Sequence, residues 1–138
     1  MHCKIFLSFL LLSLFITTCL ASERKRSKQR PGGLSQEKPA DETIRELFRD
    51  PDVSRPAKRQ IQSQRDSTSS RRRIRKIKPL AYKSQVVSGV MYYVRTRVTD
   101  RDSYQIWWIK IYEQSWNDYV KVVNVTGPQD EDEEVAYF

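Results

Sequence analysis

The residues that most often carry catalytic or metal chemistry lie together at the start of this chain. The single histidine, His2, and both cysteines, Cys3 and Cys19, fall within residues 1–21. If that segment is removed, the mature chain holds no imidazole for acid–base catalysis or metal binding and no thiol for a disulfide or a nucleophile. Hydrolases of the Ser-His and Cys-His kinds are then excluded. We therefore expect no enzyme, no metal site and no cofactor.

Residues 1–21 have the pattern of a cleaved signal peptide. Lys4 precedes an apolar run from Ile5 to Leu14, and small residues precede Ala21. A membrane-spanning helix is the alternative, but the run is short and two serines interrupt it. We expect the mature chain to begin at Ser22 and to be secreted.

The chain is also strongly basic. It holds 25 Lys and Arg against 17 Asp and Glu, a formal net charge of +8. The expected signal peptide, residues 1–21, contributes one of these lysines, Lys4. A cluster of Lys and Arg over residues 71–78 could neutralise a polyanion such as a glycosaminoglycan, an anionic membrane or a microbial surface. A solvated loop is the alternative. Nucleic acid is not expected, since no motif for reading it is present. The candidate polyanion-binding residues are Arg71, Arg72, Arg73, Arg75, Lys76 and Lys78.

A short helix is predicted near the start of the mature chain. A basic, flexible leader is expected over residues 22–30, and one domain over residues 31–138. Asp41 is a plausible N-cap, and Ile44, Leu47 and Phe48 follow at i, i+3, i+4 spacing. Prolines at 51 and 56 should stop or kink this helix, with a further turn or two over residues 57–64.

The second half of the chain has the character of an antiparallel sheet. A basic loop insertion is expected around residues 62–78. Four runs rich in aromatic and β-branched residues follow, at 82–87, 91–98, 104–112 and 119–125, with short turns between them. This order predicts an α+β fold in which an N-terminal helix, kinked or broken, packs on an antiparallel sheet of four to five strands.

The alternation of side chains between the two faces of a strand predicts which residues face the helix. Trp107, Ile109 and Ile111 share one face, so Trp108 is expected on the open face. In the last strand, Asn124 begins an Asn-Val-Thr glycosylation triplet. A glycan on Asn124 would require that side chain to point outward, with its two neighbours, residues 123 and 125, pointing inward.

Three separated stretches resemble the stefin branch of the cystatin family, also called type 1 cystatins. They are Pro-Gly-Gly-Leu-Ser at 31–35 with Lys-Pro-Ala at 38–40, Tyr-Lys-Ser-Gln-Val-Val-Ser-Gly at 82–89, and the acidic, aromatic-ended 132–138. Their order along the chain also matches the family. The resemblance implies a cystatin-like fold and a secreted, reversible, competitive inhibitor of papain-like cysteine proteases of the cathepsin type. A signal peptide is atypical of stefins, so the chain is similar to a secreted variant.

The resemblance also implies which residues enter the protease cleft. An N-terminal glycine segment and two hairpin loops would fill the cleft without offering a bond for attack. Glycine permits positive φ and close backbone approach, while an exposed tryptophan is a frequent interface anchor. A linker, an ordinary hairpin turn and a buried core tryptophan are the alternatives for the three segments. The residues implied are Gly32 and Gly33, then Gln85, Val86, Val87, Ser88 and Gly89, then Ser115 and Trp116.

Two further expectations concern partners. Stefin-like proteins can exchange strands through the first hairpin loop, so a monomer is expected, with a strand-exchanged dimer as the alternative. The competing function is a non-inhibitory interaction protein that keeps the fold and binds polyanions or microbial and membrane surfaces through its Arg/Lys-rich segment.

Overall fold

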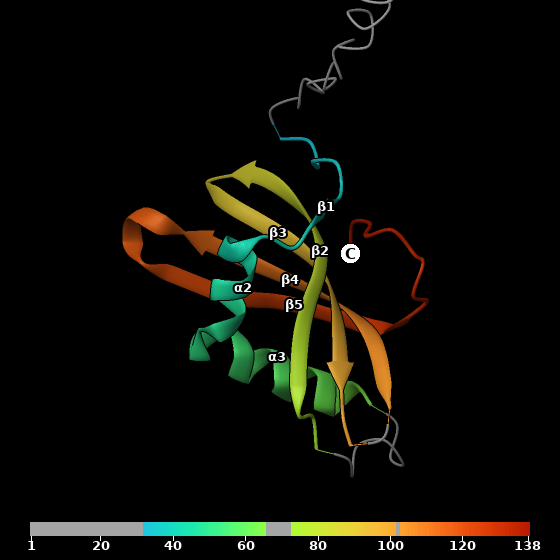
Figure 1. Cartoon of the computed structure of the whole chain (residues 1–138). Helices are drawn as coiled ribbons and strands as arrows, with labels where there is room; N and C mark the ends of the chain where they lie inside the picture. The colour runs from blue at the N-terminus through green and yellow to red at the C-terminus, as the bar shows by residue number, and fades with distance from the viewer. Residues whose placement is uncertain (1–31, 66–72, 102) are drawn as a thin grey trace, which may run out of the picture.

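A five-stranded antiparallel sheet with two helices on one face organises the chain (Figure 1). The computed structural model describes residues 32–65, 73–101 and 103–138. The strand order is β1-β2-β3-β4-β5, and each neighbouring pair is antiparallel. This confirms the predicted α+β fold class. The elements are β1 (Lys38–Pro39), α2 (Glu42–Arg49), α3 (Pro51–Gln64), β2 (Lys76–Val87), β3 (Gly89–Thr99), β4 (Tyr104–Gln114), the 3-10 turn η1 (Ser115–Asn117) and β5 (Tyr119–Gln129).

The first helix, α2, begins at the predicted cap. The Asp41 carboxylate accepts the backbone N–H of Ile44 at 3.1 Å, which satisfies a donor that the first helical turn would otherwise leave free. Ile44 and Phe48 are buried and face the sheet. The expected helix is thus confirmed.

The second helix, α3, is longer than predicted. It begins at Pro51 rather than at Ala57, because Asp50 caps it and proline suits the first helical position, where no N–H is needed. Pro56 lies inside the helix without ending it. Val53, Ala57 and Ile61 lie on one face and are fully buried, so packing on the sheet outweighs the backbone hydrogen bond that proline removes. The helical region is therefore broken at Asp50.

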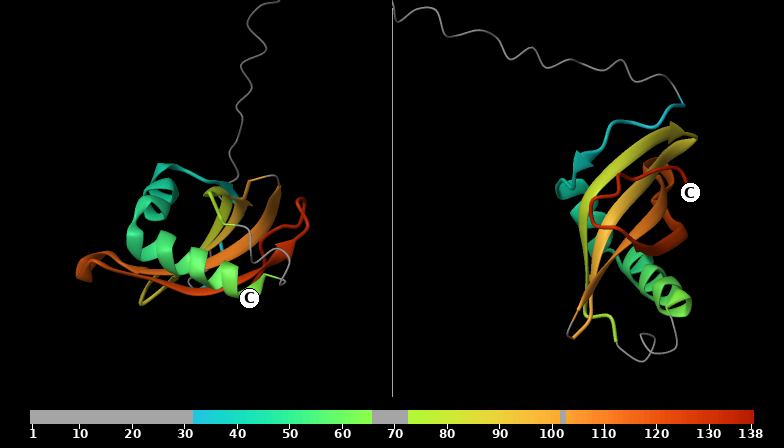
Figure 2. Two further views of the ribbon diagram at one scale, coloured as in Figure 1. Left: turned by 90° about the horizontal axis from the view of Figure 1, so that it is seen from below. Right: turned by 90° about the vertical axis from the view of Figure 1, so that its right-hand side faces the viewer.

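The main core lies between the helices and the concave side of the sheet. Figure 2 shows α3 lying across that side. Trp107, Ile109 and Ile111 of β4 are fully buried there, as their alternation predicts. The other buried members are Ala40, Ile44, Phe48, Val53, Ala57, Ile61, Ile74, Tyr82, Val94, Val98, Val122 and Val125.

The opposite face of the sheet is not open, and the expectation for Trp108 is wrong in this respect. Its side chain does point to that face, but it is buried. The C-terminal segment, residues 130–138, turns back after β5 and contributes Val135 and Phe138 to a second apolar cluster with Trp108 and Tyr93. Strand alternation could not reveal this cover, because the covering residues come from outside the sheet.

The last strand, β5, also departs from simple alternation. Lys110 pairs with Asn124 and the next residue, Ile111, pairs with Val122, so Val123 is an extra residue in the ladder. The prediction that Val123 points inward is therefore wrong: it is exposed, and Val122 is buried instead. Val125 is buried and Asn124 is exposed, as expected. Gln64 of α3 donates its side-chain amide to the carbonyl of Val125 at 2.9 Å.

The basic loop is shorter than the expected range of 62–78 where the structure describes it. Helix α3 continues to Gln64 and strand β2 begins at Lys76. Ile74, between them, is buried in the core. The expected signal peptide, the leader at 22–30, Arg71 and Arg72 lie outside the described residues. None of the described helices is long and apolar enough to cross a membrane.

Candidate functional site

The N-terminal segment, residues 32–37, runs along β2 toward its carboxyl end. The Ser35 backbone N–H donates to the carbonyl of Ser84 at 2.8 Å, and the Ser84 N–H donates to the Ser35 hydroxyl at 2.8 Å. Gly32 is exposed and has a φ of 79°, a conformation that favours glycine. Gly33, next to it, is half-buried. The segment that carries both glycines therefore lies beside the first hairpin.

Gln85 joins the N-terminal segment to the sheet. Its side-chain N–H donates to the Gly32 carbonyl at 2.8 Å, and its side-chain oxygen accepts the Tyr93 hydroxyl at 3.2 Å. Burial raises the pKa of Tyr93 above its ordinary value, so the hydroxyl keeps the proton that it donates. Tyr93 was not among the residues expected from the sequence. It precedes Val94 on β3, and because Val94 faces the main core, the Tyr93 side chain faces the other side of the sheet.

The first hairpin turn presents two apolar side chains to solvent. Val86 is 62% exposed, and Val87 is also exposed at the end of β2. Ser88 is exposed in the turn, and Gly89 begins β3 with a φ of 133°. A Cβ on Gly89 would lie 2.5 Å from the Glu113 carbonyl oxygen, so this position needs glycine both for its conformation and for space.

The second hairpin turn presents a large aromatic side chain. Ser115 and Trp116 lie in the 3-10 turn between β4 and β5, and Trp116 is 66% exposed. Trp116 is therefore not the buried core aromatic that the sequence left as an alternative. Tyr119 follows at the start of β5 and is also exposed. Tyr119 was not among the residues expected from the sequence. An aromatic residue three positions after Trp116 could have indicated it.

Hydrogen bonds hold the two hairpins side by side. The carbonyl of Ser88 accepts the Tyr112 hydroxyl and, at 3.0 Å, the side-chain amide of Gln114. Next to these contacts, Val90 of β3 pairs with Glu113 of β4 in the sheet. The turns consequently have fixed positions relative to each other, on the left side of Figure 1.

These three parts form one surface at one end of the sheet, which we call the loop end: residues 32–33, 85–89 and 115–116. It combines glycine backbone with exposed Val86, Val87 and Trp116. Such a surface can bury apolar area in a partner but contains no nucleophile paired with a base. Among the described residues, no group of three His, Cys, Asp or Glu side chains could hold a metal ion.

A buried tyrosine and a carboxylate brace the root of the N-terminal segment. The Tyr82 hydroxyl of β2 donates to the Asp41 carboxylate at 2.6 Å. This hydrogen bond lowers the pKa of Asp41, whereas burial, with Asp41 beside it, raises the pKa of Tyr82 to about 12. Asp41 thus caps α2 and at the same time ties the helix start to β2.

The remaining candidate residues lie away from the loop end. Asn124 is exposed on β5, and its side-chain oxygen accepts the N–H of Val125 at 2.9 Å. Lys76 begins β2 and Val87 ends it, so the basic residues are on the order of 30 Å from the first hairpin turn. The four described members of the basic cluster, Arg73, Arg75, Lys76 and Lys78, are all exposed.

Comparison with known proteins finds one informative similarity. No protein-family model matches the chain. The chain is similar to cystatin-A of Felis catus, with 34% identity over 70 residues, which is 51% of this chain. The match spans 60% of the length of that relative. The similarity supports the cystatin superfamily, and the two helices on a five-stranded antiparallel sheet are a cystatin-like arrangement.

Proposed function

We propose that the chain is a secreted, reversible, competitive inhibitor of papain-like cysteine proteases of the cathepsin type. The observation that carries this proposal is the loop end, where three segments far apart in the sequence meet and expose Val86, Val87 and Trp116 together. The similarity to cystatin-A points to the same class of inhibitor and favours an inhibitor over an enzyme.

The proposed mechanism is steric. The glycines let backbone approach the walls of a narrow cleft, while the valine pair and the tryptophan bury apolar surface on either side of the catalytic thiol. The hairpins are preorganised by their shared hydrogen bonds, so little conformational entropy is lost on binding. No peptide bond of the inhibitor needs to enter the position of attack, and the complex therefore dissociates unchanged.

Titration of papain and of a cathepsin with the chain starting at Ser22 tests this proposal. We expect stoichiometric, reversible loss of peptide-substrate hydrolysis at nanomolar inhibitor, relieved by raising the substrate concentration. A folded sample that leaves both proteases active at micromolar concentration would refute the proposal.

Secretion is a separate part of the proposal and has its own test. Expression of the full chain in a secretory cell should release a product whose N-terminus is Ser22. If Asn124 carries a glycan, glycosidase treatment should lower the mass of the released product, and Asn124→Gln should abolish that change. Retention of the whole chain in the membrane fraction would overturn secretion.

A second candidate function is binding to a sulfated polysaccharide. The observation that favours it is the placement of Lys76 and Lys78: Ile77 between them packs on the core, so both lysines face the opposite side of β2 and are exposed. Arg73 and Arg75 are exposed just before the strand. A row of cations on a fixed strand can follow a repeating anionic chain.

Heparin affinity chromatography of the mature chain tests this candidate. The variant Lys76→Gln/Lys78→Gln should elute at clearly lower salt than the wild type. The matched variant Lys58→Gln/Lys121→Gln loses the same charge elsewhere and should elute much closer to the wild type. Equal shifts for the two variants would mean that only net charge matters, and stronger binding to anionic vesicles than to heparin would identify a membrane instead.

A further inference from the structure

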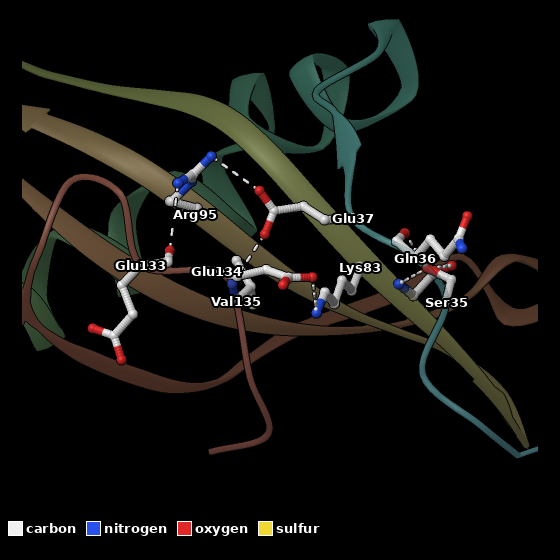
Figure 3. Close-up of polar contacts among 9 residues, drawn as sticks. Ser35, Gln36, Glu37, Lys83, Arg95, Glu133, Glu134 and Val135 are labelled. Atoms are coloured by element: carbon white, nitrogen blue, oxygen red, sulfur yellow. Dashed lines mark hydrogen bonds and ion pairs between the residues drawn. The ribbon is translucent and has the colours of Figure 1, made fainter.

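The C-terminal segment is attached to the sheet by both apolar and charged contacts. Val135 is fully buried against Tyr93 and Trp108. Around this anchor, Lys83 pairs with Glu134 at 2.7 Å and the Lys110 ammonium donates to the main-chain oxygen of Phe138 at 2.6 Å. The segment therefore has a defined path across the outer face, and at Val135 that path passes beside Glu37 of the N-terminal segment (Figure 3).

Glu37 connects the two segments. One carboxylate oxygen pairs with the Arg95 guanidinium at 2.9 Å, and the other accepts the backbone N–H of Val135 at 3.0 Å. Arg95 also donates to the main-chain oxygens of Glu131 and Glu133, at 3.0 and 3.4 Å. We call Glu37, Arg95 and Val135 the Glu37 clasp (Figure 3).

The charged pair of the clasp is shielded from solvent. The side chains of Glu37 and Arg95 are 18% and 20% exposed, far less than the glutamate and arginines that pair on α2. Such a pair is less screened by salt and water than a surface ion pair. A carboxylate that accepts both a guanidinium and a backbone N–H is also held in one orientation.

The N-terminal segment has a small number of other attachments. Strand β1 contains two residues, Lys38 and Pro39. Before it, the segment is held by the bonds between Ser35 and Ser84, by the Gln85 contact with Gly32, and by Leu34, which packs partly buried against the second apolar cluster. A segment held by so few bonds gains entropy when it is released. Glu37 lies between β1 and Ser35, so it sits between the segment's two sets of bonds to β2.

We propose that Glu37 is a positioning residue for the N-terminal segment: the Glu37 clasp uses the C-terminal segment to hold residues 32–35 against the first hairpin. Its functional consequence rests on the proposed protease inhibition, because those residues form part of the loop end. The clasp makes the C-terminal segment contribute to affinity without touching the protease.

Amide hydrogen exchange, resolved by residue in the mature chain, tests the clasp without a protease. In Glu37→Ala the Ser35 amide should exchange about tenfold faster, the effect of losing a charged hydrogen bond, while the Ile109 amide in β4 stays unchanged. Glu42→Ala is the matched control, because it loses two ion pairs confined to α2, and it should alter neither amide. Unchanged exchange at Ser35, or equal acceleration at Ile109, would overturn the proposal.

Papain inhibition by the same variants then tests the consequence. Glu37→Ala should weaken inhibition by about three- to tenfold, mainly through faster dissociation, and Glu42→Ala should not. If Glu37→Ala does not fold, Glu37→Gln, which keeps the size of the side chain, replaces it in both measurements. Wild type that fails to inhibit papain refutes the proposed function, whereas the Ser35 exchange rates still decide whether Glu37 holds the segment.

Discussion

Replacing Gly89 with alanine is the sharpest test of how the first hairpin is built. Gly89 has a φ of 133°, which L-residues rarely adopt, and an added Cβ would lie 2.5 Å from the Glu113 carbonyl oxygen and 3.0 Å from the Tyr112 ring. A residue held in this backbone region costs about 1–3 kcal/mol. Crowding against a paired strand costs about 1–3 kcal/mol more. The expected loss of unfolding free energy is therefore about 2–6 kcal/mol.

Urea unfolding followed by tryptophan fluorescence measures this loss by linear extrapolation. A loss of that size is a large part of the roughly 5–15 kcal/mol that stabilises a typical domain, so the midpoint should move to clearly lower urea. Ser88→Ala is the matched control: its side chain is exposed, and its backbone carbonyl remains available to Tyr112 and Gln114. It should change stability by less than about 0.5 kcal/mol.

A loss below about 1 kcal/mol for Gly89→Ala would refute this reasoning, since it would show that the turn relaxes to accommodate a side chain. An equal loss for Ser88→Ala would refute it in another way, because the effect would then not depend on the conformation at Gly89.

Three further substitutions test, in turn, protease binding, the pH dependence of stability and the burial of the outer face of the sheet. Trp116→Ala should weaken papain inhibition about thirtyfold or more, as at an interface hot spot, with urea stability unchanged because the side chain is exposed; a loss of stability without a loss of inhibition would contradict its place in the loop end. Tyr82→Phe should cost about 1 kcal/mol at pH 7 by removing the hydrogen bond to Asp41. Because folding lowers the pKa of Asp41, the stability that its carboxylate contributes is present above pH ~4 and is lost as the pH falls through the folded pKa. Urea titrations should therefore show the unfolding free energies of wild type and Tyr82→Phe converging in acid. A difference that stays constant with pH would count against this pairing. For Tyr82 the pH dependence of stability has the opposite sign, because folding raises its pKa to about 12. The stability that its protonated hydroxyl contributes is complete below pH ~10 and is lost as the pH rises through about 12. Val135→Ala should cost about 1–2 kcal/mol and shift tryptophan emission to longer wavelength as Trp108 gains water; unchanged emission would mean that the C-terminal segment does not cover Trp108.

The parts of the fold that are set by neighbouring residues could be predicted from the sequence. Asp41 and the spacing of Ile44 and Phe48 identify α2, since a cap and an apolar face are local patterns. Pro51 predicts a break in the helix by its type alone, whereas after the capping Asp50 it starts α3. The continuation of α3 through Pro56 depends on burial against the sheet, which no local pattern contains.

Long-range contacts explain the other differences. The extra residue at Val123 follows from how β5 fits β4, and the burial of Trp108 follows from residues about 27 positions later in the chain. At the loop end, the turns and the exposed Trp116 could be predicted, because glycine and aromatic residues mark them. The bonds from Gln85 to Gly32 and from Tyr93 to Gln85 could not, because they join residues that only the fold brings together.

The hydrogen bonding of β5 has a consequence for self-association of the protein. An edge strand with free N–H and C=O groups can pair with the edge of another molecule and start aggregation. Here the Val125 carbonyl is occupied by Gln64, the Val125 N–H is occupied by the Asn124 side chain, and Pro128 has no N–H to offer. The extra residue at Val123 further interrupts the regular spacing that a second strand would need. Around Val125 this edge of the sheet is thus a poor template for an added strand, which disfavours edge-to-edge pairing of two molecules there.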